Sequence, residues 1–469
     1  MSNHAPPPAL PDTSPDAAID RLAQALDASP LDVALHRRML DAMRAAGDEA
    51  GFAAHQIALA AFDMLGAAPP AQALALALYN LATVYSLKGR PHEAIRWYGH
   101  ALAVHPALAV AHQNLAALLT AEGDRALADR HRDQAYRLQR IYVEPALGAE
   151  QRRLLILNTG KGAGNVPLDT LLSYATTTRI KYAIDYAHEV EDAQLPAYDL
   201  VLNAIGDPDV AQPLAERIAR FTRDCGRPVL NPAHAIARTH RHRTPQWLAG
   251  VPGALAPPCI RLDTIPAHAE ALARQLAEAG IDYPLLMRPV ATHGGDGLAL
   301  YPSLETLWPA LNDLGAPCYL TTFHDFRSAD GCCRKYRIVY VDRKPYPYHL
   351  AISPHWVVHY FSAGMLDAPW KLEEERRFLN DPRGTLGARA MEAIAEIGLR
   401  LDLDYGGIDF TVLPDSRVLV FETNATMLVH REKPNGPLAH KNPFVDRIAD
   451  AFEHMLAQRE TAARRKHLA

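Results

Sequence analysis

The chain reads YGGIDFTVLPDSRVLVFETN over residues 405–424, a pattern that predicts two antiparallel strands joined by a turn. Apolar residues dominate both halves of this stretch, so we expect the two strands to be buried. Residues 414–417 read PDSR, which is typical of a turn. If this turn has four residues, Leu413 pairs with Val418, and the rest of the register follows from that pair.

Three oxygen-bearing side chains fall on one face of the predicted hairpin. The four-residue turn pairs Asp409 with Glu422, and Asn424 shares their face because side chains alternate along a strand. Two opposed carboxylates destabilise a sheet unless a positive charge lies between them. Mg²⁺ takes oxygen ligands and is usually held by one or two carboxylates together with substrate phosphates. We therefore predict a magnesium site; the alternative, carboxylates that point into water, fits poorly with the apolar flanking residues.

Three further segments surround the hairpin in the sequence and share a family resemblance with it. The four segments are LLMRPVATHGGDGLALY (285–301), YLTTFHDF (319–326), KYRIVYVDRKPYPYHLAIS (335–353) and YGGIDFTVLPDSRVLVFETNAT (405–426). Together they resemble the ATP-grasp superfamily of carboxylate–amine ligases, which contains glutathione synthetase, D-alanine–D-alanine ligase and the ribosomal-protein glutamate ligases. The resemblance spans residues 153–451.

The resemblance implies roles for the residues of the hairpin and of the strand before it. Asp409 and Glu422 would bind Mg²⁺, with Mn²⁺ as the alternative ion. Glu422 would bridge two ions, and Asn424 would complete the shell of the second. Arg337 matches the family's catalytic arginine, which neutralises charge on the transferring phosphate and on the acyl phosphate.

The resemblance also implies a set of ATP-binding residues. Arg288 stands where the family has Lys, and it is expected to be a second catalytic residue. Its guanidinium would bind two oxygens of an α- or β-phosphate; the alternative is a surface ion pair. The Gly-rich loop offers backbone N–H groups to phosphate. Its members are His293, Gly294, Gly295 and Gly297. Arg241 matches a phosphate-binding lysine, with Arg243 as the near alternative and a solvated basic face as the competing interpretation.

The segment after the strand at 318–322 corresponds to the hinge that binds adenine through backbone groups in this family. By this resemblance Thr322, Phe323 and His324 lie near the base, and Asp325 is the expected ribose ligand. Lys335 stands where the family has Asp, which indicates either an anionic substrate or a surface lysine. We interpret a nearby group as substrate pocket wall, namely His349, His355, Trp356 and His359.

The N-terminal part of the chain is helical and repeats with a period of 34 residues. The matched residues are Asn80, Leu81, Ala82, Gly89, Ala94 and Ala101 in one copy and Asn114, Leu115, Ala116, Gly123, Ala128 and Ala135 in the next. This pattern resembles the tetratricopeptide repeat family, whose stacked helix pairs form a solenoid that binds a peptide or a partner protein. The alternative is a helical bundle without a ligand.

The hydrophobic pattern changes to alternating strands and helices after Glu150. Buried strands are expected at 153–158, 180–184 and 199–207, with helices at 168–174 and 210–224, which predicts a parallel sheet covered on both faces. The stretch GKGAGN lacks the spacing of a nucleotide-binding loop, so we interpret it as a tight turn between strand and helix.

Composition limits the classes of partner and compartment. A net charge of −5 argues against a nucleic-acid or anionic-membrane binder. Apolar residues make up 49% of the chain and charged residues 22%, which excludes disorder as the main state. We find no run of about 18 apolar residues and no signal peptide at the N-terminus. Five cysteines, an odd number, are simplest to explain as reduced thiols in a cytoplasmic protein.

These observations predict a tetratricopeptide solenoid, then an α/β pre-ATP-grasp domain and an α+β ATP-grasp domain. The expected boundaries are a disordered leader at 1–16, repeats at 17–145, a Rossmann-like domain at 150–235, the catalytic domain at 236–460 and a tail at 461–469. The expected activity is ATP-dependent amide formation from a small-molecule or peptide carboxylate and an amine, through an acyl phosphate. The alternatives are a decayed module, favoured by Arg288 and Lys335, that acts as a repeat-based interaction protein, and a kinase on the same fold.

Overall fold

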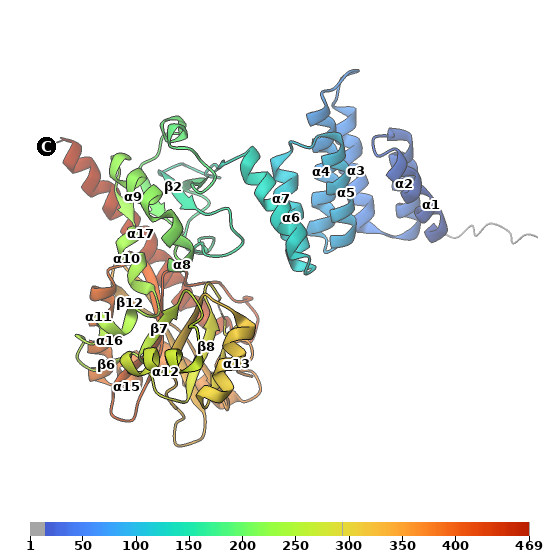
Figure 1. The fold of residues 1–469 in the computed structure, drawn as a ribbon. Helices are drawn as coiled ribbons and strands as arrows, with labels where there is room; N and C mark the ends of the chain where they lie inside the picture. The colour runs from blue at the N-terminus through green and yellow to red at the C-terminus, as the bar shows by residue number, and fades with distance from the viewer. Residues whose placement is uncertain (1–14, 293, 469) are drawn as a thin grey trace, which may run out of the picture. The chain divides into compact units, whose positions relative to one another are not determined.

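The computed structural model describes residues 15–292 and 294–468. Both the predicted leader, up to residue 14, and His293 lie outside the described residues. The chain divides into two compact units (Figure 1). One holds the N-terminal helices up to Arg140 together with Gly160–Gly162, and the other holds the sheets. None of the described helices is both long enough and apolar enough to cross a membrane.

The first unit consists of helices joined by short connections, as the sequence predicts. The helices are α1 (Pro15–Ala28), α2 (Val33–Ala46), α3 (Glu49–Asp63), α4 (Ala71–Leu87), α5 (Pro91–Val104), α6 (Ala109–Ala121) and α7 (Arg125–Leu138). The backbone turns into the left-handed region at Gly89 after α4 and at Gly123 after α6, with φ of +73° and +90°. These two equivalent glycines end the first helix of each pair, as the 34-residue period predicts.

The repeated apolar and small residues form the core of this unit. Leu81 and Ala82 of α4, and their equivalents Leu115 and Ala116 of α6, are all buried. In the second helix of each pair the small residues at equivalent positions are buried as well, namely Ala94, Ala101, Ala128 and Ala135. The period therefore reflects helix packing; the assignment to the tetratricopeptide family stays a prediction.

A buried pair of histidines joins α2 to α3. The Nδ1 atoms of His36 and His55 lie 2.8 Å apart, and Nε2 of His36 lies 2.9 Å from the carbonyl oxygen of Pro30. Since a carbonyl only accepts, His36 donates from Nε2, and in the neutral pair Nδ1 of His55 donates to Nδ1 of His36. The same arrangement recurs between His112 and His131, also with a 2.8 Å separation.

We expect the helical unit to lose stability as the pH falls. Burial, followed by the charges of His36 and Arg96, lowers the pKa of His55 from 6.5 to about 3. The neutral form therefore contributes its full stability above pH 6.5, and this contribution is lost as the pH falls towards 3. At pH 4 the loss amounts to roughly 3 kcal/mol, from 1.36 kcal/mol for each pKa unit.

Hydrogen exchange of peptides from α2 and α3, corrected for the intrinsic rate at each pH, measures this loss. Protection should fall between pH 6.5 and pH 4 in the natural chain. His55→Leu removes the titrating ring, so protection of these peptides should then depend much less on pH. An equally steep loss in His55→Leu would contradict the assignment.

The second unit begins with a five-stranded sheet. Its strands are β1 (Ile141–Glu144), β2 (Arg152–Asn158), β3 (Thr177–Ala183), β4 (Leu200–Asn203) and β5 (Val229–Leu230), in the order β1-β3-β2-β4-β5. The strands β3, β2, β4 and β5 are parallel, as predicted, and β1 adds an antiparallel edge that the sequence analysis missed.

Two helices predicted next to this sheet differ from the structure. Residues 168–174 form turns, in which the N–H groups of Leu171 and Leu172 both donate to the carbonyl oxygen of Leu168. The predicted helix at 210–224 is divided into α8 (Pro208–Ala211), a 3-10 turn and α9 (Ala215–Asp224). Pro213, which lacks an N–H group, lies at the division.

Helices cover both faces of the five-stranded sheet, but the second helix comes from the far end of the chain. Leu155 and Leu157 of β2 share a core with α9, whereas Leu154 and Ile156 share a core with α17 (Asn442–Leu468). The buried Arg152 of β2 also forms ion pairs with two glutamates of α17. One of them is Glu460, the last residue of the predicted catalytic domain. The predicted tail at 461–469 is helical as far as Leu468.

A four-stranded antiparallel sheet follows in the order β7-β10-β8-β9. Its strands are β7 (Cys259–Leu262), β8 (Leu285–Pro289), β9 (Ala299–Tyr301) and β10 (Cys318–Thr322). The helices α12 (Ala269–Glu278) and α13 (Leu304–Leu314) pack against one face, which contributes Leu285, Met287 and Leu320 to their shared core (Figure 1). The other face is therefore free to form the wall of a site.

A second five-stranded sheet has the order β12-β11-β13-β14-β6. The elements are β6 (Ala254–Leu255), β11 (Cys333–Val341), β12 (Lys344–Ser353), β13 (Tyr405–Val412) and β14 (Val418–Asn424), with α14 (Pro369–Asn380) and α16 (Ala388–Leu401). The even-numbered residues of β11 from Tyr336 to Tyr340 share a core with α14 and α16. Side chains alternate, so Lys335 and Arg337 lie on the opposite face.

The predicted hairpin exists, but its register near the turn is one residue off the prediction. Val418 pairs with Val412 and not with Leu413. A β-bulge between Asp409 and Phe410 adds one residue on β14, so Asp409 still pairs with Glu422. The bulge therefore restores the pairing of Asp409 with Glu422. The prediction reached the same pair by assuming a different register at the turn.

Candidate functional site

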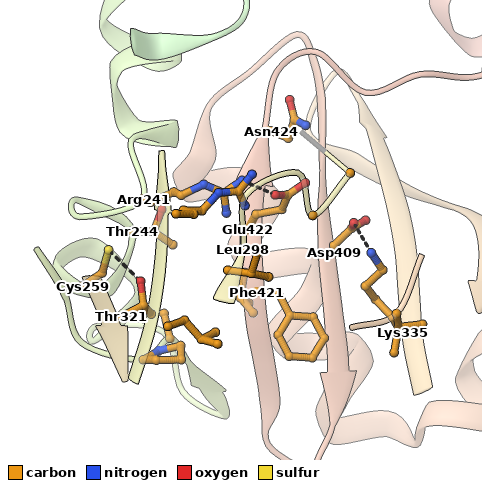
Figure 2. Close-up of a pocket in the computed structure, with 18 of the residues that line it drawn as sticks. Arg241, Thr244, Cys259, Leu298, Thr321, Lys335, Asp409, Phe421, Glu422 and Asn424 are labelled. Carbon is orange, nitrogen blue, oxygen red and sulfur yellow. Dashed lines mark hydrogen bonds and ion pairs between the residues drawn. The ribbon is translucent and has the colours of Figure 1, made fainter. Parts of the chain in front are cut away.

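A cavity of about 760 Å³ lies within the second unit. The four-stranded sheet lines the cavity with Leu286, Arg288 and Thr321, and the sheet that contains the hairpin lines it with Asp409 and Glu422 (Figure 2). Two sheets thus contribute polar side chains to one cavity, which is a typical arrangement for a ligand-binding site.

The hairpin directs its three predicted metal ligands into this cavity. Asp409 and Glu422 are direct cross-strand partners, and Gly407 pairs with Asn424, so the three side chains share a face as predicted. The Asp409 side chain is only 4% exposed and that of Glu422 is 19% exposed. The bulge at Phe421 brings this ring into the cavity beside Glu422.

Basic side chains neutralise both carboxylates. Arg337 donates from Nε and Nη2 to the two oxygens of Asp409, at 2.6 and 2.8 Å, and Nζ of Lys335 lies 3.3 Å from Oδ2 of the same carboxylate. Arg241 donates from Nη2 to Glu422, whereas Arg243 is exposed and does not line the cavity. The interpretation of the basic run around Arg241 as a solvated face is therefore wrong for that residue.

These ion pairs determine the protonation of the two acids. Burial raises the pKa of Asp409, but the charges of Arg337 and Lys335 outweigh burial and hold it well below its usual range. Burial and the charge of Asp409 oppose ionisation of Glu422, but the charges of Arg241, Arg288 and Lys335 together outweigh them, and the pKa of Glu422 is lowered to about 2. Both acids are therefore ionised at neutral pH, which is the form that binds a cation.

Arg288 is buried beneath the Gly-rich loop, and it has no ion pair among the residues that the structure describes. It donates from Nη2 to the carbonyl oxygen and the hydroxyl of Thr292, whereas its buried Nε has no acceptor in the described part of the chain. Burial, followed by the charge of Arg241, lowers the pKa of Arg288 to about 10. The alternative of a surface ion pair is therefore wrong, and a buried donor without a partner suits an anionic ligand.

The glycines of the loop differ in their placement. Gly294 and Gly295 line the cavity, whereas Gly297 packs against Pro289, where an added Cβ would lie 2.7 Å from Cδ of the proline. Because the φ angle of Gly297 is also +67°, any other residue there would be strained.

Part of the predicted hinge lines the cavity. Thr322, Phe323 and His324 line the cavity, but the N–H groups of Thr322 and Phe323 donate to the carbonyls of Pro258 and Pro284. Those two donors are already in use, so they do not meet a base in this arrangement. The predicted ribose ligand, Asp325, does not line the cavity and forms an ion pair with Arg327.

Sequence reasoning missed several residues of the cavity. Next to the hinge the apolar members are Ala256, Cys259, Leu286, Leu298, Phe326, Leu419 and Phe421. They resemble ordinary core residues in the sequence, so no local signal separates them from the core. Asn165 and Gly164 of the GKGAGN stretch also line the cavity. The side chain of Asn165 bonds both backbone groups of Thr159, which closes the loop after β2 and adds a wall residue. No helix lies among the described residues between β2 and β3, so the interpretation as a turn between strand and helix is wrong.

The predicted substrate wall is divided. Trp356 and His359 line the cavity together with Val357, whereas His349 is buried behind Arg337 as its cross-strand partner and His355 is exposed. An added Cβ on Gly294 would lie 3.5 Å from Nε2 of His359, so the Gly-rich loop and this wall are in contact. The loop therefore covers the end of the cavity that this wall forms.

The carboxylates fit a magnesium ion that is shared with phosphates. The oxygen of Asn424 accepts bonds from the N–H and hydroxyl of Thr426, just as Asp409 accepts from Arg337 and Glu422 from Arg241, but only the two acids offer a negative charge to an ion. No group of three or more His, Cys, Asp and Glu within residues 15–292 and 294–468 could form a metal site by itself. Two carboxylates that rely on phosphate for the remaining ligands are what Mg²⁺ commonly uses.

No family model matches the sequence, and no curated protein matches it either. Three similar solved structures are ligases. D-alanine–D-alanine ligase from Bacillus anthracis in complex with ATP is 12% identical, and the match covers 67% of this chain and 99% of that chain with a TM-score of 0.39. VanG D-Ala:D-Ser ligase from Enterococcus faecalis is 12% identical over 65% and 100%, with a TM-score of 0.40.

The third is the ATP-grasp ligase PsnB with a phosphomimetic variant of its minimal precursor, Mg and ADP. It is 12% identical over 66% of this chain and 99% of that chain, with a TM-score of 0.36. The similarity to each of these three ligases extends over about two thirds of this chain.

Proposed function

We propose that this chain is an ATP-grasp carboxylate–amine ligase. The observation that supports it is one cavity with two opposed, ionised carboxylates, Asp409 and Glu422, and a buried guanidinium, Arg288, whose Nε lacks an acceptor within the described chain. The carboxylates suit Mg²⁺ and the guanidinium suits phosphate, and Mg²⁺ with phosphate is the chemistry of ATP.

The apolar end of the cavity would receive the base, since Leu286, Leu419 and Phe421 offer it a dry surface. Arg288 and Arg241 would neutralise the phosphates, and the backbone of Gly294 and Gly295 would close over them. This order sets the phosphates between the base and the two carboxylates of the hairpin. Asp409 and Glu422 would hold Mg²⁺, which polarises the transferring phosphoryl group when it is bound.

The reaction would have two steps. The substrate carboxylate attacks the γ-phosphorus, the bond from that phosphorus to the β–γ bridging oxygen breaks, and an acyl phosphate and ADP form. An amine then attacks the acyl carbon, phosphate leaves, and an amide bond results. Arg337 would turn from Asp409 to the transferring phosphoryl oxygens in the first step. The Gly-rich loop would exclude water, which otherwise hydrolyses the acyl phosphate.

The helical unit belongs to the same proposal as the part that recruits a peptide or protein partner. A stack of helix pairs cannot itself perform phosphoryl transfer, but it offers an extended surface for binding. In this proposal the recruited partner carries the acid or the amine, and the cavity acts on it.

Hydroxylamine provides a test that does not require the natural amine. The full chain is incubated with ATP, Mg²⁺, hydroxylamine and a panel of amino acids and short peptides, and ADP, phosphate and hydroxamate are measured. We expect equal amounts of all three with at least one acid, and none without Mg²⁺. ADP with a phosphorylated product would show a kinase instead, and no ADP with any acid would favour a protein that acts only through its helices.

A further inference from the structure

The cavity carries more basic than acidic side chains among the residues that the structure describes. The basic members are Arg241, Arg288, Lys335 and Arg337, and the acidic members are Asp409 and Glu422. Two of the four basic side chains have a carboxylate of their own, as described above. The excess consists of Arg288 and Lys335, and an excess of this sign attracts anions.

Lys335 is not needed to neutralise Asp409. Arg337 already donates to both oxygens of that carboxylate, at 2.6 and 2.8 Å, in the forked geometry that makes such pairs strong. Nζ of Lys335 reaches only one of the two oxygens, at 3.3 Å. Its side chain is 18% exposed and lines the cavity, so it can meet a ligand there.

The position of Lys335 separates it from the groups proposed to bind the nucleotide. Figure 2 shows Lys335 beside Asp409, at the side of the cavity away from Cys259 and Thr321. Arg288, the other excess cation, belongs to the opposite sheet. Burial, and then the charges of Lys335 and Arg337, lower the pKa of His359, which agrees with Lys335 lying near the substrate wall.

We propose that Lys335 binds a second carboxylate on the acid substrate, so that this ligase activates a dicarboxylic acid. The inference rests on the proposed function, because it takes the reacting carboxylate to lie near Arg337. Lys335 and Arg337 are two residues apart on one strand, a spacing of roughly 6–7 Å. An aliphatic diacid with a short chain spans such a distance, and its far carboxylate would take the place of Asp409 as the partner of Lys335.

Binding of a matched pair of acids tests the inference without turnover. The probes are glutarate and its half-amide glutaramate, which differ in one charge. Each acid is titrated into the full chain in the presence of ADP and Mg²⁺, and the unfolding temperature and the dissociation constant are measured. We expect glutarate to bind about tenfold to a hundredfold more tightly than glutaramate, and Lys335→Gln to abolish this preference while the affinity for ADP stays within about twofold.

Lys344→Gln is the matched control, because Lys344 is exposed at the start of β12 and lies outside the cavity. This variant should keep the preference for glutarate. The inference is overturned if the natural chain binds both acids equally, if Lys335→Gln keeps the preference, or if Lys335→Gln weakens ADP as much as glutarate.

Turnover gives a second measurement that separates the two proposals. In the hydroxylamine assay, Lys335→Gln should raise KM for the active diacid by about tenfold to a hundredfold and change KM for ATP by less than about threefold. Equal use of a diacid and its half-amide by the natural chain would overturn the role of Lys335 and leave the ligase intact. No turnover with any acid would overturn the ligase, and the binding comparison would still decide what Lys335 recognises.

Discussion

Asp409→Asn should lower kcat/KM for magnesium-dependent ADP formation by at least about a hundredfold. Loss of a residue that only hydrogen-bonds to a metal ligand lowers metal affinity or activity by about 10–100-fold. Asp409→Asn removes the charge of a proposed direct ligand, so its effect should be at least as large. Raising the Mg²⁺ concentration should restore little of the activity, since an amide is a poor substitute for a carboxylate. Steady-state ADP release at a series of Mg²⁺ concentrations measures the effect.

The same substitution also disturbs the fold, so it needs a control for stability. Asp409 is buried and paired with Arg337 and Lys335, and removal of one member of a buried ion pair costs about 3–5 kcal/mol. Asp404 is the matched residue, because its side chain is 5% exposed and it pairs with Arg343 and Arg459, at 2.8 and 3.0 Å, outside the cavity.

Asp404→Asn should lower the unfolding temperature about as much as Asp409→Asn but keep most of the ADP formation of the folded protein. The metal assignment is wrong if Asp409→Asn retains magnesium-dependent turnover, or if the two variants lose activity equally. Circular dichroism at the assay temperature shows how much of each variant is folded.

Arg337→Met should lower kcat by roughly a thousandfold while KM for ATP changes by less than tenfold. An arginine that meets the transferring phosphoryl group stabilises charge chiefly in the transition state, and such residues contribute about 10³–10⁵ in kcat. Because methionine has a similar length and no charge, the substitution removes the guanidinium and keeps much of the packing.

Arg334→Met is the control for the ion pair that Arg337→Met also breaks. Arg334 lies three residues earlier on β11 and pairs with Glu374 of α14 and with Asp330, at 2.8 Å to the latter, away from the cavity. It should lose stability without a large change in kcat. A similar decrease in both variants, or an effect of Arg337→Met on KM alone, would show that Arg337 has no role in the chemical step.

The repeat glycines and the pairing of Asp409 with Glu422 illustrate what local patterns can predict. Gly89 and Gly123 lie at a fixed spacing, and helix ends favour glycine for a backbone reason that involves only a few residues. In the hairpin, alternation directs three polar side chains to one face. The register at Val418 was wrong, and the carboxylates still met because a bulge, which no turn rule signals here, compensated for the slip.

The helix that covers the parallel sheet illustrates where such patterns fail. The sequence analysis expected a helix at 168–174, next in the chain to β2, but this segment forms turns, and the helix that shares the core on that face of the sheet is α17. Which segment packs on a face of the sheet depends on which apolar surface fits it in space. The partners Arg152 and Glu460, for example, are 308 residues apart in the chain. A local hydrophobic pattern contains no information about such a partner.

The sequence by itself determined the two strands of the hairpin, the parallel strands of the first sheet, the repeating helices and the identity of the acids on the hairpin, because strand alternation and helix period act between near neighbours. Only the tertiary structure decided which cation meets which acid: Arg241 reaches Glu422 across 181 residues, and Arg337 reaches Asp409 across 72. It also selected Arg241 over Arg243 and left Asp325 outside the cavity. The physical reason is that charge pairing and burial depend on distance in space, which the folded sheets set and the order of residues does not.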